Sequence, residues 1–265
     1  MIIMKKFLAI VLAALLMLCC LTGCGEKGKT LAEVKEAGVI TMATSPDFPP
    51  FENLDGTEVV GIEVDVMNLI AKELGVELKI EQMDFDSVLP GVQAGKFDVG
   101  VSGISVTPAR EKNTLFTDPY CLAAQAIVVM EDSAVKTKAD LEGKKISVQT
   151  ATTAEEYCMG EGYDVSAFAA NSDAETALTT GKVDAWVIDD LTAAEMVKEY
   201  NATAEKKLVI LEEAMTTEPY AFAFAFGSED LVEEINGILA KLVKDGTVKG
   251  IFDKFEAPYT SPETK

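Results

Sequence analysis

The chain has 265 residues, 48% of them hydrophobic, and a formal net charge of −21. This length suits one or two domains with substantial cores. The acidity argues against nucleic-acid binding, which needs clustered basic residues, and the absence of histidine removes the commonest general base and metal ligand.

The first 23 residues have the layout of a secretory signal. A lysine pair precedes an apolar run over residues 7–18, which is shorter than the roughly 20 residues of a transmembrane helix. The run is followed by Leu21-Thr22-Gly23-Cys24, which resembles the lipobox of bacterial lipoproteins. The resemblance implies cleavage before Cys24, a lipid on Cys24 that anchors the protein to the extracytoplasmic face of the cell membrane, and a tether over residues 24–30. The alternative is an ordinary signal peptide cleaved nearby, with Cys24 unmodified.

Removal of residues 1–23 would leave 242 residues with a formal net charge of −23. Beyond Cys24 the cysteines are Cys121 and Cys158. They could form one disulfide in an exported protein, although two independent buried thiols are favoured. Two cysteines without histidine are too few ligands for a zinc-type site, so we expect no metal.

Short apolar strands alternate with amphipathic helices, a pattern that predicts an α/β fold of mostly parallel sheets covered by helices. In the first half, strands are predicted over residues 38–44, 77–83 and 97–103. Ile62, Val66, Ile70 and Leu74 recur every four residues and predict a helix that stops at Gly75. A second helix, capped by Asp86 or Ser87, is predicted to end near residue 95.

After Pro119 the alternation starts again. Strands are predicted over residues 126–130, 145–149 and 183–188, near residue 208, and over residues 220–226. Helices are predicted over residues 139–143, 153–160, 172–180, 191–200 and 228–244. Residues 258–265 are predicted to be a flexible tail.

A five-residue pattern occurs twice in the chain. Gly95-Lys96-Phe97-Asp98-Val99 ends a helix and begins a strand, and so does Gly181-Lys182-Val183-Asp184-Ala185. The repetition suggests two similar lobes. Ligands of open α/β sheets bind beyond the carboxyl ends of the strands. Two facing lobes would therefore direct residues 102–110 and the pair Asp189-Asp190 at a shared cleft.

Residues 102–110 offer the donors that a carboxylate needs. The segment contains Gly103 for close backbone approach, three hydroxyl side chains, amides before a helical turn, and Arg110. Arg110 is the only arginine of the sequence, against 22 lysines. We therefore expect it where lysine cannot replace the planar guanidinium. The alternative is a surface arginine in a turn rich in serine and threonine.

Asp189 follows an apolar strand in the second half and could receive a ligand ammonium. Asp189 and Asp190 could instead cap the helix that starts at Leu191. We expect Asp189 to lie in the cleft and Asp190 nearer the cap. Arg110 and Asp189 together describe the partners of an amino-acid zwitterion, because a charge enclosed in a dry cleft needs a partner.

Further candidates lie at other strand ends. The segment Gln149-Thr150-Ala151-Thr152-Thr153 could give amides and hydroxyls to the same carboxylate, or only cap a helix. Phe48 and Phe85 could sandwich the aliphatic part of a ligand, although such aromatic residues more often belong to a core.

These motifs together resemble the polar-amino-acid-binding proteins of ABC importers, the bacterial extracellular solute-binding proteins of family 3 with a type II periplasmic-binding-protein fold. The resemblance extends from about Leu31 to Ala257. It is carried by residues 44–51, 61–66, 102–110, 116–120, 143–146, 152–153 and 184–190. It implies a two-lobed Venus-flytrap fold with crossovers near residues 121–125 and 215–220. Lobe 1 would comprise residues 31–122 and 219–257, and lobe 2 residues 123–218.

The resemblance also implies the ligand-binding set Phe48, Phe85, Ser102, Gly103, Ser105, Arg110, Gln149, Thr153 and Asp189. Arg110, the backbone at Ser105 and the helix start at Thr153 would hold the ligand carboxylate. Asp189 and the Gly103 carbonyl would hold the ammonium, and the two phenylalanines would flank the side chain. The chain would then be a monomeric, cofactor-free binding protein that delivers a free amino acid to an ABC permease and its ATPase.

Three positions depart from the family pattern. Ser45 stands where several relatives that bind basic ligands have an acid, Ile188 replaces a polar residue that is common before the aspartate, and Gln149 holds a position that varies with the ligand. They favour a neutral polar amino acid, while Asp47 and Asp84 leave cationic ligands open. Two other functions remain as alternatives. A dehydratase-like enzyme would need an acid or base that the pocket motifs lack, and a sensor module would bind without transport.

Overall fold

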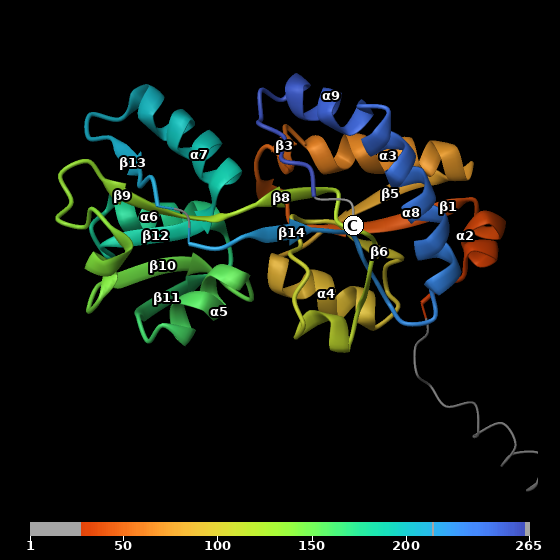
Figure 1. The fold of residues 1–265 in the computed structure, drawn as a ribbon, viewed down its shortest axis with the longest axis horizontal. Coiled ribbons are helices and arrows are strands. Elements are labelled where there is room, and N and C mark those ends of the chain that lie inside the picture. The colour runs from red at the N-terminus through yellow and green to blue at the C-terminus, as the bar shows by residue number, and fades with distance from the viewer. Residues whose placement is uncertain (1–27, 214, 263–265) are drawn as a thin grey trace, which may run out of the picture.

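The computed structural model describes residues 28–213 and 215–262, which form two α/β lobes joined by two strands (Figure 1). The expected signal segment and Cys24 lie outside these residues. Within the described part of the chain, no helix is both long enough and apolar enough to cross a membrane. The predicted two-lobed fold is confirmed by the two five-stranded sheets.

Lobe 1 opens with helix α2 (Leu31–Ala37), which a capping box between Thr30 and Glu33 starts. Helix α3 (Ile62–Leu74) buries the four apolar residues that predicted it and ends at Gly75, where φ is 76°. The other elements before the first crossover are β1 (Val39–Thr44), β2 (Asp47–Phe48), β3 (Glu52–Asp55), β4 (Glu58–Val60), β5 (Glu77–Gln82), α4 (Phe85–Gln93), β6 (Val99–Gly100), the 3₁₀ helix η1 (Arg110–Lys112) and β7 (Leu115–Phe116).

The lobe 1 sheet has the order β5-β1-β6-β15-β7, with β1 parallel to β5 and β6. Strand β15 (Ala223–Phe224) returns from the far end of the sequence and runs antiparallel to its neighbours. Alternate residues of β1 face opposite cores: Met42 lies in the core with α3, and Ala43 in the core with α4. The two helices therefore cover opposite faces of the sheet, with α8 (Glu229–Lys244) and α9 (Thr247–Lys254) beside α3 (Figure 1).

Lobe 2 has the sheet order β11-β10-β12-β9-β13. Its elements are β9 (Gln125–Met130), the 3₁₀ helix η2 (Lys138–Leu141), β10 (Lys145–Gln149), α5 (Thr153–Gly160), β11 (Asp164–Phe168), α6 (Asn171–Thr179), β12 (Ala185–Asp189), α7 (Asp190–Thr203) and β13 (Leu208–Ile210). Val187 packs in the core with α5, whereas Trp186 packs with α6 and α7. This sheet too is covered on both faces.

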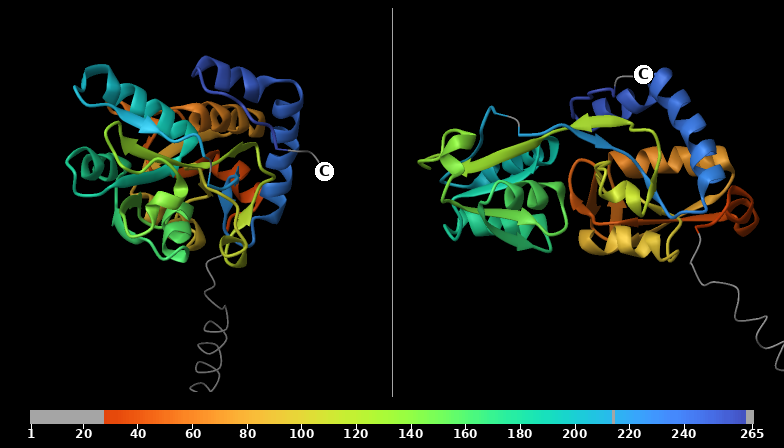
Figure 2. Two further views of the ribbon diagram at one scale, coloured as in Figure 1. Left: turned by 60° about the vertical axis from the view of Figure 1, so that its left-hand side comes forward. Right: turned by 60° about the horizontal axis from the view of Figure 1, so that its bottom comes forward.

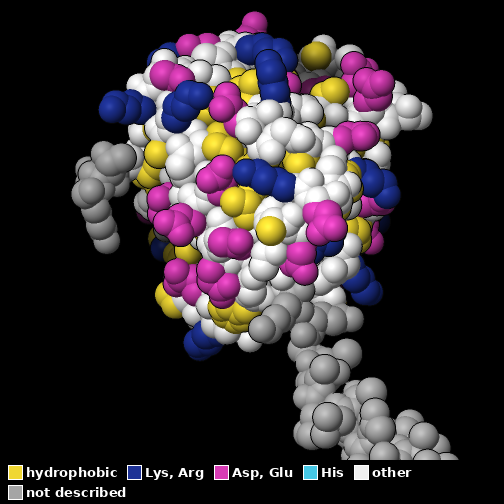
Figure 3. All heavy atoms as spheres, turned by 90° about the vertical axis from the view of Figure 1, so that its right-hand side faces the viewer, with side chains coloured by type: hydrophobic (Ala, Val, Ile, Leu, Met, Phe, Trp, Pro, Cys, Tyr) yellow, Lys and Arg dark blue, Asp and Glu magenta, His cyan; other side chains and the backbone are white. Residues whose placement is uncertain are grey.

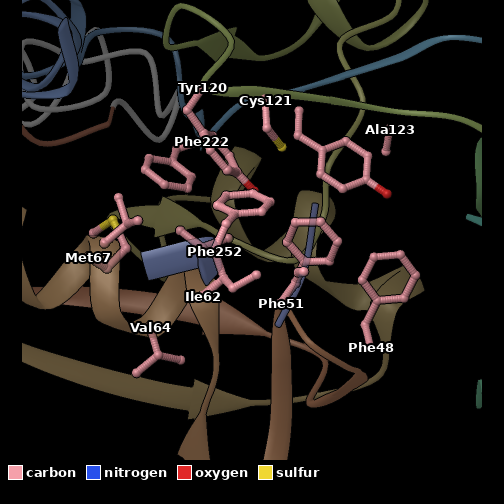
Figure 4. Packing of buried hydrophobic residues seen from close by; sticks show 14 of the residues in the cluster. Phe48, Phe51, Ile62, Val64, Met67, Tyr120, Cys121, Ala123, Phe222 and Phe252 are labelled. Carbon is pink, nitrogen blue, oxygen red and sulfur yellow. The ribbon is translucent and has the colours of Figure 1, made fainter. Parts of the chain in front are cut away.

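The crossovers are β8 (Cys121–Ala123) and β14 (Glu218–Tyr220), which pair antiparallel. The chain thus enters and leaves lobe 2 through adjacent strands, which Figure 2 shows from two further sides. Aromatic side chains fill the lobe 1 core beneath them (Figure 4). There Tyr120 stacks on Phe222 at a centroid distance of 5.1 Å. Cys121 and Cys158 are buried, unpaired thiols, as favoured from the sequence.

Several predicted boundaries differ from the observed ones. Strand β6 covers two residues rather than the predicted 97–103, and the run over residues 220–226 divides into β14 and β15. The N-cap of α4 is Asp84, so the assignment of the cap to Asp86 or Ser87 is wrong. Strand β11 and helix α9 are additional elements, and both are short, with five and eight residues.

The first residues of the expected tail contact lobe 1. The Tyr259 hydroxyl donates to the Tyr120 carbonyl at 2.9 Å, and the Leu122 amide donates to the Thr260 carbonyl at 2.9 Å. The tail prediction therefore does not hold at these two residues.

On the outer end of lobe 1, acidic and basic side chains alternate over the surface (Figure 3).

Candidate functional site

A narrow pocket lined by residues of both lobes lies between them. All nine predicted binding residues line it, together with Ser45, Asp47 and Thr152. The structure therefore brings together six residues of lobe 1 and three of lobe 2 that are far apart in the sequence.

Strand ends account for this convergence. Ser45 follows β1, Ser102 lies just beyond β6, and Gln149 and Asp189 are the last residues of β10 and β12. Parallel strands place their carboxyl ends at one edge of a sheet, and the two sheets turn these edges toward one another. The pocket lies where the sequence predicts it.

Gly103 is required at its position for two reasons. Its φ is +53°, in the left-handed region that side chains disfavour. A β-carbon there would lie 2.4 Å from Cε1 of the Phe48 ring. The glycine thus lets Phe48, which is only 8% exposed, pack against the pocket backbone.

Arg110 lies in the 3₁₀ turn η1 and points into the pocket. Its Nη1 donates to the Ser105 carbonyl at 2.9 Å, and its Nη2 donates to the Ala151 carbonyl of lobe 2 at 3.1 Å. The Phe85 ring lies 5.8 Å from the guanidinium carbon. Burial lowers the pKa of Arg110 below its usual range, although the carboxylates of Glu218 and Asp189 oppose that shift. Within the described residues Arg110 has no ion pair, so a charged donor faces the pocket.

The backbone at Ser105 faces the same side. Val106 donates to the Pro219 carbonyl, and Ala221 donates to the Ile104 carbonyl, on either side of an isolated bridge between Ser105 and Tyr220. In this antiparallel pattern the N–H and C=O of the middle residue point away from the partner strand. Since the Ser105 carbonyl accepts from Arg110, its amide points toward the arginine side as well.

Asp189 is the negative group of the pocket and is 7% exposed. Burial raises its pKa to about 7, while a hydrogen bond from Gln125 Nε2 at 3.0 Å lowers it. The buried Tyr220 hydroxyl lies beside this carboxylate without the geometry of a full hydrogen bond. Asp190 turns the other way and accepts from the amides of Leu191 and Ala124 at 2.8 and 3.2 Å. The helix starts at Asp190, one residue earlier than predicted, and Asp189 holds the N-cap position without a side-chain capping bond. Asp189 lines the pocket, as expected, and the Asp190 side chain contacts the amides at the helix start.

The start of α5 forms the lobe 2 wall beside Arg110. Thr152 caps the helix by accepting from the Glu155 amide at 3.2 Å, and its hydroxyl donates to the Gln149 carbonyl at 2.7 Å. Thr153 receives a hydrogen bond from Gln125 Nε2 at 3.3 Å. The N-terminus of a helix favours negative ligand groups, so this wall suits the same carboxylate as Arg110.

Asp47 both lines the pocket and connects the lobes. Its Oδ2 accepts from the Asn171 amide at 2.7 Å and from Gln149 Nε2 at 3.3 Å, and its Oδ1 accepts from the Ser45 hydroxyl at 2.9 Å. Burial raises the pKa of Asp47, and these hydrogen bonds oppose the rise. Asp84, in contrast, is exposed and does not line the pocket.

Sequence reasoning missed Asn171 and Gln125, which hold Asp47 and Asp189 in place. Neither lies in a recognisable motif, and each reaches its partner only through tertiary packing. Within the described residues, no three cysteine, aspartate or glutamate side chains are arranged to hold a metal ion.

Comparison with known proteins agrees with this geometry. The model of the bacterial extracellular solute-binding proteins, family 3, matches residues 40–257. The L-cystine-binding protein TcyJ of Escherichia coli strain K12 is 30% identical over 230 residues, 85% of each chain. Solved structures are similar as well, and two of them bear on the ligand. An ancestral arginine-binding protein bound to glutamine shares 38% identity with a TM-score of 0.77, over 83% of this chain and 99% of its own. The ancestral amino acid-binding protein AncCDT-1, a precursor of cyclohexadienyl dehydratase, shares 32% identity with a TM-score of 0.79, over 86% and 99%. The chain belongs to the bacterial extracellular solute-binding proteins of family 3.

Proposed function

We propose that this protein binds a free amino acid between its lobes and delivers it to an ABC importer. The observation that carries the proposal is that Arg110 and Asp189 line one pocket without forming an ion pair with each other. Buried opposite charges that are not paired require partners from elsewhere. The carboxylate and ammonium groups of an amino acid provide both.

The ligand carboxylate binds the Arg110 guanidinium, the Ser105 amide and the N-terminus of α5 at Thr153. A guanidinium presents two parallel donors, which match the two oxygens of a carboxylate. The ammonium binds Asp189 and the Gly103 carbonyl. Phe48 and Phe85, which both line the pocket, flank the ligand side chain.

The charged side chains of the pocket lining indicate which amino acids can bind. Arg110 and Asp189 neutralise the two backbone groups of the ligand, and Asp47 is a second carboxylate in the lining. An acidic ligand side chain would be repelled there. Neutral polar and cationic amino acids are therefore the candidates. Glutamine in the ancestral structure and cystine in the E. coli relative are first probes of the neutral class.

Cys24 carries the lipid in this proposal and anchors a monomer at the extracytoplasmic face of the membrane. A tether of a few residues separates it from α2, which starts at Leu31. The binding lobes would then face their permease from the membrane surface. A sensor module would bind the same ligand but would not support its uptake, so uptake by cells with and without the protein separates these functions.

An enzyme on this fold is the other alternative, and AncCDT-1 shows that such a relationship exists. A dehydratase needs an acid or base directed at a reacting centre. Here both pocket carboxylates already have partners. Asp47 accepts hydrogen bonds from Asn171 and Gln149. Asp189 pairs with the ligand ammonium in this proposal. Turnover of a prephenate-like substrate by the purified protein would revive the enzyme proposal.

A thermal-shift screen against all proteinogenic amino acids tests the proposal. A ligand that binds only the folded state stabilises it by ~4 kcal/mol at a thousandfold excess over Kd. We expect a shift with one or a few neutral polar or cationic amino acids, and none with aspartate or glutamate. If no amino acid raises the melting temperature, the proposed function is wrong.

A further inference from the structure

Two glutamates meet in the interior directly behind the pocket. Glu52 is the first residue of β3 and Glu63 the second residue of α3, and both are 0% exposed. A buried carboxylate is costly unless donors surround it. Neither residue lines the pocket, so ligand contact does not account for them.

Glu63 has the donors that an ionised carboxylate needs. Its Oε2 accepts from the Gly103 amide at 2.8 Å, and its Oε1 accepts from the Tyr120 hydroxyl at 2.7 Å. Burial raises the pKa of Glu63, whereas these two hydrogen bonds and the neighbouring Glu52 side chain lower it. Donors placed in this way favour the charged form of a buried carboxylate.

Glu52 has the surroundings of a protonated acid. Its Oε1 accepts from the Ser102 hydroxyl at 3.0 Å, whereas its buried Oε2 has no N–H or O–H donor among the described residues. Burial and the neighbouring Glu63 charge raise the pKa of Glu52 well above its usual range. The other titratable groups that face the pair are Tyr120, Cys121 and Asp47, and none of them is a cation.

We propose that Glu52 and Glu63 share one proton, carried by Oε2 of Glu52 and donated to Glu63, and that this pair positions Ser102 and Gly103 for the ligand ammonium. A proton on that oxygen gives Oε2 its missing partner and removes the repulsion between two buried carboxylates. The positioning role rests on the proposed function of the pocket, whereas the shared proton does not.

The positioning argument follows the hydrogen bonds outward. Glu63 holds the Gly103 amide and Glu52 holds the Ser102 hydroxyl, so each residue of the turn is attached to one member of the pair. The Ser102 oxygen accepts in turn from the Ser45 amide at 3.0 Å. All three residues line the pocket. The pair therefore fixes the Gly103 carbonyl, which is the proposed acceptor for the ammonium.

Two isosteric variants separate the roles. In Glu52→Gln the amide nitrogen donates to Glu63 and the amide oxygen accepts from Ser102, so we expect ligand affinity within about threefold of wild type. In Glu63→Gln one amide N–H must face the Gly103 amide, the Tyr120 hydroxyl or the Glu52 proton. We expect affinity to fall at least tenfold. Glu58→Gln, at the exposed first residue of β4, is the matched control.

Infrared spectroscopy can detect the proton proposed on Glu52 directly. At pH 8 with an amino-acid ligand bound, exposed acids are ionised and the ligand ammonium keeps Asp189 ionised. Wild type should show the C=O band of a buried carboxylic acid, shifted in D₂O. The band should disappear in Glu52→Gln and persist in Glu58→Gln, Asp47→Asn and Asp189→Asn.

Absence of the band in wild type, or its persistence in Glu52→Gln, would overturn the shared proton. Equal affinity losses in Glu52→Gln and Glu63→Gln would overturn the positioning role. If Glu63→Gln does not fold, Tyr120→Phe takes its place as the test variant, because it removes one of the hydrogen-bond donors to Glu63. Unchanged ligand affinity in Tyr120→Phe would then overturn the positioning role. If no amino acid binds wild type, the proposed function fails, and the band measured on the protein alone still decides the proton.

Discussion

Nη2 of Arg110, in lobe 1, donates to the backbone carbonyl of Ala151, in lobe 2, over 3.1 Å. Ala151 has a φ of 63°, a conformation that costs a non-glycine residue on the order of 1–3 kcal/mol. The other terminal nitrogen of the guanidinium, Nη1, donates to the carbonyl of Ser105 in lobe 1 at 2.9 Å. One side chain thus spans the cleft at the place where the ligand carboxylate is proposed to bind.

Replacement of Arg110 should therefore impair ligand binding without unfolding the protein. Truncation of one partner of an enclosed charge pair costs ~2–5 kcal/mol, or about thirtyfold to several thousandfold in Kd. Arg110→Lys keeps the charge but loses the planar fork, so calorimetric titration should show at least tenfold weaker binding, and Arg110→Ala should be weaker still. Exposed Lys112→Ala, in the same 3₁₀ turn, is the control. Equal affinity of wild type and Arg110→Lys would remove the carboxylate assignment.

Ligand binding should weaken in acid because of Asp189. Its pKa is raised to about 7, so below that pH the carboxyl must lose a proton before it can pair with an ammonium. We expect Kd to rise as pH falls from 8 to 6, approaching about tenfold per pH unit well below the pKa. Asp189→Asn should bind weakly at every pH, with a flat profile. A wild-type profile that is also flat would contradict this role.

The same shift predicts a stability effect of opposite sense. An acid whose pKa is higher in the folded state binds more protons when folded, so its contribution to stability falls as pH rises from about 4 to about 7. Without ligand, Asp189→Asn should therefore melt at a higher temperature than wild type at pH 8, and the difference should shrink toward pH 4. Calorimetric melting at several pH values measures it. A lower melting temperature for the variant at pH 8 would contradict the burial penalty.

Gly103→Ala and Gly143→Ala form a matched pair. Both glycines have positive φ, 53° and 71°, but a β-carbon at Gly143 would meet nothing within 4 Å, whereas one at Gly103 would strike Phe48. Gly143→Ala should lose roughly 1 kcal/mol of stability from the backbone alone. Gly103→Ala should lose more and also bind ligand more weakly, as chemical unfolding and titration can show. Similar losses of stability in the two variants would mean that the Phe48 ring can move away from the added methyl group at little cost.

Asp47 should contribute to lobe closure. Asp47→Asn keeps the shape but presents an amide nitrogen to one of its partners, the Ser45 hydroxyl, the Asn171 amide or Gln149. We expect several-fold weaker binding of every ligand, and a larger loss for cationic than for neutral amino acids because a negative charge is removed. Asp84→Asn, exposed at the α4 N-cap, is the control. A loss confined to cationic ligands would show that Asp47 acts on charge alone.

Membrane attachment should depend on Cys24. Cys24→Ala is expected to leave folding and amino-acid binding intact and to release the protein from membranes. Fractionation after a salt wash measures attachment. A variant that remains with the membrane would point to another anchor.

The pocket was predictable because its residues follow strand ends and carry distinctive chemistry. A lone arginine among lysines and an aspartate after an apolar strand are visible without a structure. The supporting residues were not. Asn171 reaches Asp47 across 124 positions, and Gln125 reaches Asp189 across 64. The first pair depends on how the two lobes meet and the second on the pairing of β12 with β9, and residue periodicity encodes neither.

The fold shows the same division. Helix α3 ends at the predicted glycine because its apolar residues recur at the helical period, and β10 has its predicted limits because it is a short apolar run buried on both faces of the sheet. Strand β6 is shorter than predicted because the chain turns at Ser102 and Gly103 toward Glu52 and Glu63. The glutamates lie 50 and 40 residues from their partners in this turn.

The position of β15 has a consequence for the order of assembly. Lobe 2 is one continuous stretch of chain, whereas the lobe 1 sheet takes β15 between β6 and β7 only after both crossovers exist. A chain emerging from its N-terminus can therefore complete the second lobe first. Until Ala223 and Phe224 arrive, β6 and β7 lack the strand that separates them, and the first lobe cannot close its sheet. Lobe 1, whose first strands are synthesised before lobe 2, is therefore the lobe whose sheet is completed last.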